Sequence, residues 1–335
     1  MIYKEIKNKI LNSQNLNMKE AKFIFDLIME GKLSEIDVTA ILVALKIKNE
    51  SEEEIIGAAK SMREKSLKIK SPHNTVDTCG TGGDMSGTLN ISTSAAIVAA
   101  SAGAKVAKHG NRSISSKSGS ADMLEKLGYK ITSNINELEL SLEKNNFCFL
   151  FAQHHHAAMK HVINIRKQLG TRTIFNLLGP LTNPANAKNQ LLGVYEKKLV
   201  RTHCNTLKAL GSDHAMVING RDGLDEISLS DITYVSELKK NNIKEYIFNP
   251  NDYGYNFINN SDIKGNDPEY NAKKFIEMLN GTYREYQYIV ELNAGAALYL
   301  AGICNNLKDG FDLARESIES KKTLKYVDSI TSGNI

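Results

Sequence analysis

From about residue 75 onward, short apolar segments typical of β-strands alternate with segments typical of helices. We expect strands over 75–78, 105–108, 147–152, 190–195, 214–218 and 243–248, and helices that include 92–102, 272–279, 286–306 and 308–320. Strands that alternate with helices form a mainly parallel sheet with both faces covered. The pattern therefore predicts an α/β fold for the larger part of the chain.

The first 70 residues show helical patterns only. Two capping boxes are expected, in which a short polar side chain and the acid three residues later satisfy free N–H groups: Asn17 with Glu20, and Ser51 with Glu54. Two apolar stripes at one-turn spacing predict faces buried in a core or a subunit contact: Ile2, Ile6 and Ile10, then Ala21, Ile24, Phe25 and Ile28. Pro72 blocks helix continuation, so a linker is expected near 70–74.

The composition of the 335 residues narrows the class of protein. Hydrophobic residues make up 41% and charged residues 24%, which are globular values and argue against disorder, collagen or a coiled coil. The net charge of +4 does not favour a protein that coats nucleic acid, but it leaves room for a local anion site.

Membrane insertion and export are not expected. The longest apolar run, 95–104, is about half of the ~20 residues that a bilayer requires. The start of the chain carries charges where a signal peptide needs an apolar stretch. Cysteines at positions 79, 148, 204 and 304 form no CxxC pair and indicate a reducing compartment. We therefore expect a cytoplasmic protein.

The first motif with chemical meaning is the glycine-rich turn 77–84, between an expected strand and an expected helix. Gly80, Gly82 and Gly83 permit positive φ angles and let backbone N–H groups approach an anion. The segment 90–93 follows at the start of the next helix, where free N–H groups and the helix dipole favour phosphate. The alternative is an ordinary glycine-rich turn followed by a polar helix cap.

Three better-known phosphate motifs do not fit this turn. A dinucleotide fingerprint needs glycine where the chain has Met85, and a Walker A loop needs glycine where it has Ser116. The common phosphoribosyltransferase signature has acids and an apolar run before its glycines, where this chain has Thr78 and Cys79. Another kind of loop would therefore bind the phosphate.

A second motif, 108–120, follows an expected strand and precedes an expected helix. Its three cations, Lys108, Arg112 and Lys117, stand among five serines and two glycines. Charge, hydroxyl donors and a bendable backbone suit a polyphosphate. The alternative is a polar surface loop. It is disfavoured because the motif lies at the carboxyl end of a strand, where α/β sheets bind ligands.

The adjacent acids Asp225 and Glu226 follow Gly223 in an expected loop. Their carboxylates can hold Mg²⁺, which takes hard oxygen ligands and bridges substrate phosphates. Such a pair is also common on ordinary surfaces. A polyphosphate site elsewhere in the chain favours the metal interpretation.

Arg166 precedes the long segment 171–185. Its guanidinium could clamp a carboxylate in a bidentate manner or make a structural salt bridge, and the sequence leaves both open. The histidines at 154–156 and 161 do not indicate a metal site, because successive residues on a helix point in different directions. We expect them in the core or on the surface.

Together these segments resemble the anthranilate phosphoribosyltransferase family of tryptophan biosynthesis, over essentially the whole chain. The Lys-His-Gly-Asn-Arg run at 108–112 is specific, because related pyrimidine nucleoside phosphorylases depart from it. The run Asn-Leu-Leu-Gly-Pro-Leu-Thr-Asn-Pro at 176–184 is similarly telling. The matching blocks are 77–84, 90–93, 108–119, 166–170, 171–185, 225–226 and 292–298.

The resemblance implies a nucleoside phosphorylase/phosphoribosyltransferase-like fold in two domains. Residues 1–70 would form a small all-helical domain, with a mid-chain helical insertion near 157–187. Residues 71–156 and 188–335 would form the α/β domain that binds phosphoribosyl pyrophosphate. The resemblance also implies a homodimer through the N-terminal helices, and neither nucleic acid nor membrane as a partner.

The implied reaction joins anthranilate to phosphoribosyl pyrophosphate and releases pyrophosphate, with about two Mg²⁺ ions per subunit. Gly80, Asn111 and Arg166 would bind anthranilate, and Ser92, Asp225 and Glu226 would hold Mg²⁺. The residues implied to bind phosphoribosyl pyrophosphate are Gly80, Gly83, Asp84, Thr88, Asn90, Ile91, Ser92, Thr93, Lys108, His109, Gly110, Asn111, Arg112, Ser113, Ile114, Ser115, Ser116 and Ser120.

No residue is assigned as a catalytic base. Lys108 would neutralise the departing pyrophosphate and Arg166 would position anthranilate. The chain departs from the family pattern at Ala157 and Asn164, where the family usually has proline. We expect these departures to affect the rigidity of the anthranilate-side helix and its affinity.

Two rival functions remain within the same fold. One is a nucleoside phosphorylase, which Arg166 and the acidic pair 225–226 argue against. The other is a non-catalytic nucleic-acid-binding relative, which the mild net charge and the complete motifs argue against.

Overall fold

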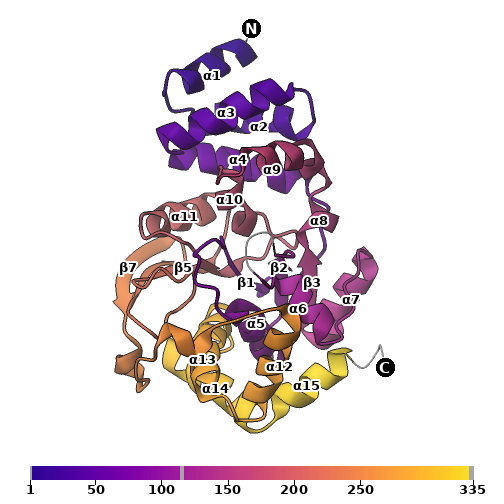
Figure 1. Cartoon of the computed structure of the whole chain (residues 1–335), viewed down its shortest axis with the longest axis vertical. Helices are drawn as coiled ribbons and strands as arrows, with labels where there is room; N and C mark the ends of the chain where they lie inside the picture. The colour runs from indigo at the N-terminus through magenta and orange to yellow at the C-terminus, as the bar shows by residue number, and fades with distance from the viewer. Residues whose placement is uncertain (1, 114–116, 332–335) are drawn as a thin grey trace.

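A seven-stranded sheet forms the centre of the computed structural model, which describes residues 2–113 and 117–331 (Figure 1). Its order is β3-β2-β1-β4-β5-β6-β7; β1 to β5 are parallel, and β6 and β7 are antiparallel to their neighbours. The predicted α/β fold with a mainly parallel sheet is confirmed. The strands are β1 (Val76–Gly80), β2 (Val106–Gly110), β3 (Phe147–Phe151), β4 (Asn189–Gly193), β5 (His214–Gly220), β6 (Thr233–Lys239) and β7 (Asn242–Phe248).

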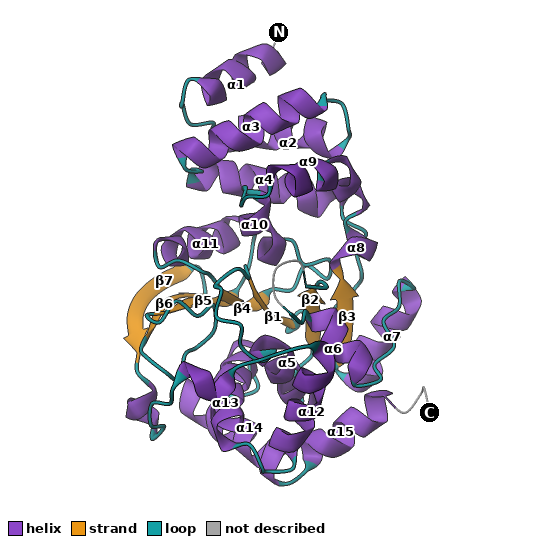
Figure 2. Cartoon of the chain, in the orientation of Figure 1, coloured by secondary structure: helices purple, strands orange, loops and turns teal. Residues whose placement is uncertain are grey.

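Helices cover both faces of the sheet (Figure 2). α5 (Ile91–Ser101) lies between the sheet and other helices, and all its residues except Ser92 are buried. α7 (Ile135–Asn145) packs on β3. The same hydrophobic core as α5 includes α6 (Ser120–Lys126), α12 (Pro268–Leu279), α13 (Arg284–Leu300), α14 (Leu307–Glu319) and α15 (Lys322–Thr331).

The N-terminal helices form a separate layer at one end of the molecule (Figure 1). They are α1 (Ile2–Leu11), α2 (Met18–Met29), α3 (Glu35–Lys48) and α4 (Glu52–Lys65). The capping boxes predicted at Asn17 and Ser51 are both present. The second predicted apolar stripe is buried, whereas Ile2 of the first stripe is 62% exposed.

Short mid-chain helices share a second hydrophobic core with the N-terminal helices and with α11 (Lys198–Ala209). They are η1 (Ala157–His161), α9 (Ile163–Leu169), α10 (Phe175–Leu178) and η2 (Gly179–Leu181), which follow α8 (Ala152–His155). The division into domains at 70, 157 and 187 stays a prediction. In the described part of the chain, no helix has both the length and the apolar character needed to cross a membrane.

Some elements differ from the sequence predictions. β6 was not predicted, because Ser236, Glu237 and Lys239 interrupt its apolar pattern. The expected helix 286–306 is wrong at its end: α13 ends at Leu300, and Gly302 takes a φ of +74° soon after. Ala152, expected in a strand, begins α8. The remaining short helices are η3 (Pro250–Tyr253) and η4 (Asn260–Ile263).

Candidate active site

The polar motifs of the sequence converge where the parallel strands end. The glycine-rich turn leaves β1 after Gly80, the second motif leaves β2 after Gly110, and the acidic pair follows β5. Parallel strands bring their carboxyl ends to one edge of a sheet, which is where such sheets bind ligands.

Lys108 is buried in β2, with 1% of its surface exposed. Its Nζ donates hydrogen bonds to the carbonyl oxygen of Thr78 at 2.6 Å and to Oγ of Ser92 at 3.3 Å. Burial lowers the pKa of this ammonium, and the carboxylate of Asp77 opposes that shift. The charge is therefore held between β1 and the first turn of α5.

Asp77 is a buried carboxylate that the sequence analysis did not assign to the site. Its Oδ1 accepts a hydrogen bond from the N–H of His109 at 3.0 Å, and its Oδ2 accepts one from Nε2 of Gln190 at 3.2 Å. Burial raises the pKa of Asp77, while Lys108 lowers it. An acid inside an expected buried strand could have indicated this role. A buried charge needs partners, so such an acid must contact other polar groups.

Asp225 and Glu226 lie on backbone N–H groups that we expected to bind phosphate. Oδ2 of Asp225 accepts from the N–H of Gly82 at 2.8 Å, and Oε1 of Glu226 accepts from the N–H of Ser92 at 3.0 Å. Burial raises the pKa of both carboxyls, and neighbouring acids, including Asp84, raise them further. The turn and the start of α5 thus bind carboxyl oxygens in this structure.

Two glycines at strand ends make room for Asp225. A Cβ added to Gly193 would collide with the backbone carbonyl of Asp225, and one added to Gly80 would collide with its carboxylate. Gly80 and Gly193 face each other across β1 and β4. Gly193 lies outside the motifs recognised in the sequence. Its signal is a glycine within an expected strand, which often marks a close approach of another backbone.

Polar side chains tie the starts of α5 and α6 together. Oγ1 of Thr93 donates to Oγ of Ser120 at 3.0 Å, and Oγ of Ser118 donates to Oδ1 of Asn90 at 3.1 Å. The same Asn90 oxygen accepts from Nδ2 of Asn271 at 2.8 Å. The structure therefore brings the two predicted phosphate motifs side by side.

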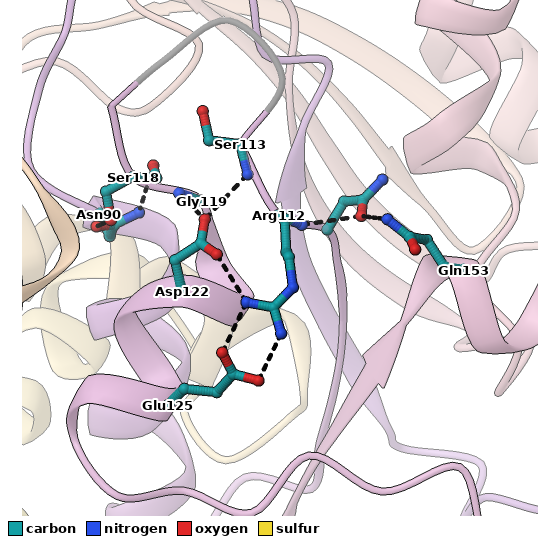
Figure 3. A network of polar contacts seen from close by, with 9 residues as sticks. Asn90, Arg112, Ser113, Ser118, Gly119, Asp122, Glu125 and Gln153 are labelled. Carbon is teal, nitrogen blue, oxygen red and sulfur yellow. Dashed lines mark hydrogen bonds and ion pairs between the residues drawn. The ribbon is translucent and has the colours of Figure 1, made fainter. Parts of the chain in front are cut away.

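Arg112 lies in a network of polar contacts with α6 (Figure 3). Its guanidinium donates to Asp122 at 2.9 Å and to the two carboxylate oxygens of Glu125 at 2.6 Å each. Asp122 also accepts from the N–H groups of Ser113 at 3.0 Å and Gly119 at 2.9 Å. In this structure Arg112 forms ion pairs with the acids of α6. Its contact with a phosphate therefore stays a prediction.

Arg166 lies on α9, which packs on α3. Its guanidinium carbon is 5.5 Å from the centroid of the Phe175 ring, and burial lowers its pKa. Within the residues that the structure describes, this guanidinium has no hydrogen bond or ion pair. The alternative role for Arg166 was a structural salt bridge. No partner for such a salt bridge is found in that part of the chain.

Asn111 and two histidines lie at the end of β2. Oδ1 of Asn111 accepts from Nε2 of Gln153 at 3.4 Å. The ring centroids of His109 and His156 are 5.3 Å apart, and the Nε2 atom of each is buried without a partner among the described residues. Burial lowers the pKa of both, that of His156 to about 4, so both imidazoles are neutral at pH 7.

The other predicted residues are spread around the same turns. Asp84 accepts a hydrogen bond from the N–H of Ser86 at 3.3 Å. Gly83 takes a φ of +76°, Thr88 pairs with Lys264 in an isolated bridge, and Ile91 begins α5. Ile114, Ser115 and Ser116 lie outside the described residues.

The donor set around Asp225 suits Mg²⁺. Two adjacent carboxylates supply hard oxygens, and Mg²⁺ is usually held by one or two carboxylates together with substrate phosphates. Among the described residues, no group of three or more His, Cys, Asp or Glu side chains is placed to hold a metal ion. The residues fit a metal ion that is shared with a substrate.

A helical bundle joined to an α/β unit is the two-part arrangement of a glycosyl transferase family. The model of that family's a/b domain matches residues 72–324, and the model of its helical bundle domain matches residues 4–66. Anthranilate phosphoribosyltransferase of Thermoanaerobacter sp. (strain X514) is 44% identical over 331 residues, which cover 98% of each chain.

Solved structures agree with these matches. The crystal structure of anthranilate phosphoribosyltransferase from Thermus thermophilus has a TM-score of 0.91 and 36% identity, over 98% of both chains. The Saccharomyces cerevisiae enzyme in complex with PRPP and Mg has a TM-score of 0.87 and 30% identity, over 98% of this chain and 97% of that one. This chain belongs to the anthranilate phosphoribosyltransferase family.

Proposed function

We propose that this chain transfers the phosphoribosyl group of phosphoribosyl pyrophosphate to the amine of anthranilate, giving N-(5-phosphoribosyl)anthranilate and pyrophosphate in tryptophan biosynthesis. One observation carries the proposal: the N–H groups of Gly82 and Ser92 hold carboxylate oxygens beside the buried ammonium of Lys108. Such N–H groups with an adjacent cation form an anion site. Membership of the family supports phosphoribosyl pyrophosphate as that anion.

Phosphoribosyl pyrophosphate would bind across the two motifs, 80–93 and 108–120. When pyrophosphate leaves, positive charge develops on the ribose ring and negative charge on the leaving group. Lys108 is fixed by Thr78 and Ser92, so it needs no reorganisation to neutralise the leaving group.

Asp225, Glu226 and Ser92 would hold Mg²⁺, about two ions per subunit, together with oxygens of the substrate. When bound, Mg²⁺ neutralises charge on the departing pyrophosphate. The matched yeast enzyme is described in complex with PRPP and Mg. If Asp225 and Glu226 bound a metal ion, the backbone N–H groups of Gly82 and Ser92 would become available to phosphate oxygens.

Anthranilate would bind through Arg166, with Gly80 and Asn111 beside it. The guanidinium of Arg166 has no anion among the described residues and is partly desolvated, so a carboxylate would bind it strongly. Positioning of this kind can lower a barrier by roughly 7–11 kcal/mol. Anthranilate is a weak aromatic amine and neutral at pH 7, so no catalytic base is assigned.

We further propose a homodimer through the N-terminal helices. Ile36 is 81% exposed and Ile47 is 74% exposed on α3, and Ile2 and Leu11 are exposed on α1. Large exposed apolar residues gathered on one unit mark an interaction surface. A cytoplasmic location is proposed because the four cysteines are all free thiols.

The decisive assay follows the fluorescence of anthranilate. The chain has no tryptophan, so its own emission does not obscure that signal. Purified protein should consume anthranilate only when phosphoribosyl pyrophosphate and Mg²⁺ are both present. Folded protein that leaves anthranilate unchanged under these conditions contradicts the proposal. An assay with nucleoside and phosphate tests the nucleoside phosphorylase rival and should show no turnover. A salt titration with DNA tests the nucleic-acid-binding rival and should show no binding.

A further inference from the structure

Arg172 was not part of the predicted site, yet it contacts the glycine-rich turn. Its Nη2 donates a hydrogen bond to the backbone carbonyl of Gly83. Its guanidinium carbon lies 3.9 Å from the centroid of the Tyr195 ring, just after β4. A planar guanidinium with a face on a ring and an edge on a carbonyl is held in a defined orientation.

Tyr195 is itself tied to the same turn. Its N–H donates to Oγ1 of Thr81 at 3.2 Å, and the N–H of Thr81 donates to the carbonyl of Gly193 at 2.9 Å. Arg172 and Tyr195 therefore brace the turn from the end of β4, in addition to the contact that Asp225 makes with it.

The turn needs such a brace because two consecutive glycines form it. Gly82 and Gly83 have φ angles of +65° and +76°, and glycine has more conformational freedom than any other residue. A peptide unit is planar, so the contact that fixes the carbonyl of Gly83 also fixes the N–H of Asp84, which points the opposite way. Within the described residues, no group accepts a hydrogen bond from that N–H.

Arg172 also joins this turn to the helical side of the molecule. It belongs to the segment 170–174, which connects α9 to α10. The N–H of Gly170 donates to the carbonyl of Arg166 at 3.2 Å, and Thr171 accepts from Nζ of Lys46 on α3. A continuous path of contacts therefore runs from the helix of Arg166 to Gly83.

We propose that Arg172 is a positioning residue that holds the Gly83–Asp84 peptide unit with its N–H toward phosphoribosyl pyrophosphate, and that links this turn to the anthranilate-side helix α9. The inference rests on the proposed function. It assigns Arg172 no contact with the reacting atoms. Its charge has no carboxylate partner in the described ranges.

The test compares Arg172→Ala, Arg172→Lys and Tyr195→Leu with a matched control. The control is Lys197→Ala, because Lys197 stacks on Tyr234 at the same 3.9 Å and has no described contact with the turn. Loss of a hydrogen bond from a charged donor should raise KM for phosphoribosyl pyrophosphate about ten- to a hundredfold in Arg172→Ala. KM for anthranilate should change less, Arg172→Lys should recover part of the loss, and Lys197→Ala should match the wild type.

Calorimetric binding of phosphoribosyl pyrophosphate with Mg²⁺ provides a second measurement that needs no turnover. We expect weaker binding in Arg172→Ala, and a less than additive loss when Tyr195→Leu is combined with it. Unchanged affinity in both Arg172 variants overturns the inference. A lower Tm and a lower kcat with both KM values unchanged would also overturn it, because those changes describe a structural residue. Failure of the proposed function would instead appear as no turnover by the wild type.

Discussion

The carboxylate of Asp225 accepts a hydrogen bond of 2.8 Å from the backbone N–H of Gly82, although 143 positions separate the two residues along the chain. The glycine-rich turn therefore already binds a carboxyl oxygen. A phosphate oxygen at that N–H would replace the carboxylate, and Mg²⁺ is the partner that the carboxylate would take instead. Under the proposed function, metal binding and phosphate binding would be linked at this one N–H group.

Asp225→Asn should stabilise the fold while it removes the metal ligand. Burial raises the pKa of Asp225 in the folded protein, so stability falls as pH rises from the unfolded to the folded pKa and stays lower above it. Asparagine keeps an oxygen for the N–H of Gly82 but carries no charge. At mildly alkaline pH we expect the Tm of the variant to be about 2–4 °C higher. This is the shift that about 1 kcal/mol of unfolding free energy produces in a large domain. The gain should disappear below the usual aspartate pKa; a lower Tm at alkaline pH would refute this.

The demand for Mg²⁺ should decrease as pH rises from mildly acidic to mildly alkaline values. Burial and mutual repulsion raise the pKa of Asp225 and Glu226, and a protonated carboxyl must lose its proton before it can bind a metal ion. Mg²⁺ titrations of activity at several pH values measure this trend. Glu226→Gln should make it shallower and increase the Mg²⁺ required, with excess Mg²⁺ restoring part of the rate. An identical trend in the variant would remove Glu226 from the metal site.

Arg166→Ala should raise KM for anthranilate roughly ten- to a hundredfold, with little change for phosphoribosyl pyrophosphate. A charge-assisted hydrogen bond to a carboxylate is worth about 1.5–3 kcal/mol, and no described residue satisfies this guanidinium. Steady-state kinetics with each substrate varied in turn provide the measurement. Arg201→Ala is a suitable control, since Arg201 is an exposed partner of Glu245 away from α9. Equal effects of Arg166→Ala on both substrates would show a structural role.

Gly193→Ala should damage the metal site from the end of β4. The added methyl group collides with the backbone carbonyl of Asp225, so the segment 225–226 must shift, at a cost of about 1–3 kcal/mol. We expect a lower Tm and a higher Mg²⁺ requirement. Gly179→Ala is the matched stability control, because nothing lies within 4 Å of its added Cβ. A Gly193→Ala protein with wild-type Mg²⁺ dependence would show that Asp225 has more freedom than the structure indicates.

Ala157→Pro should restore rigidity on the anthranilate side. Ala157 is the first residue of η1, a position that suits proline. Proline disfavours helical backbone angles in the residue before it, and His156 lies outside that region, with a φ of −115° and a ψ of 56°. We expect a stability gain of about 0.4–1 kcal/mol and a lower KM for anthranilate. Thermal unfolding and kinetics measure the two effects. A less stable variant would mean that the local backbone does not accept proline.

Local signals made much of the fold predictable. The capping boxes at Asn17 and Ser51, and the strand, turn and helix over 75–102, depend on residues that are close in the chain, so the sequence displays them directly. β6 depends on pairing with β5 and β7, which no local pattern reveals. The same limit explains why the antiparallel edge of the sheet was not anticipated.

The site was predictable as a set of motifs but not as a set of contacts. Lys108 was expected at the end of a strand and in contact with a polyphosphate, but its contacts with Thr78 and Ser92 and its burial could not be predicted. Gly193 and Arg172 were missed because their importance comes from residues that are distant in the chain. Composition and spacing do not show which backbone carbonyl a side chain reaches.

The hydrogen bond between Gly82 and Asp225 also has a consequence for how the chain folds. It closes a loop that contains β2, β3, β4 and β5, and the contact between Ser92 and Glu226 spans 134 positions. Contacts so distant in sequence form only after much chain entropy has been lost, so they belong to late stages of folding. A partly folded chain with its first helices in place would therefore have no site for either substrate. Ligands of this site should slow hydrogen exchange across the whole central sheet, since they bind only the state in which all its parallel strands are paired.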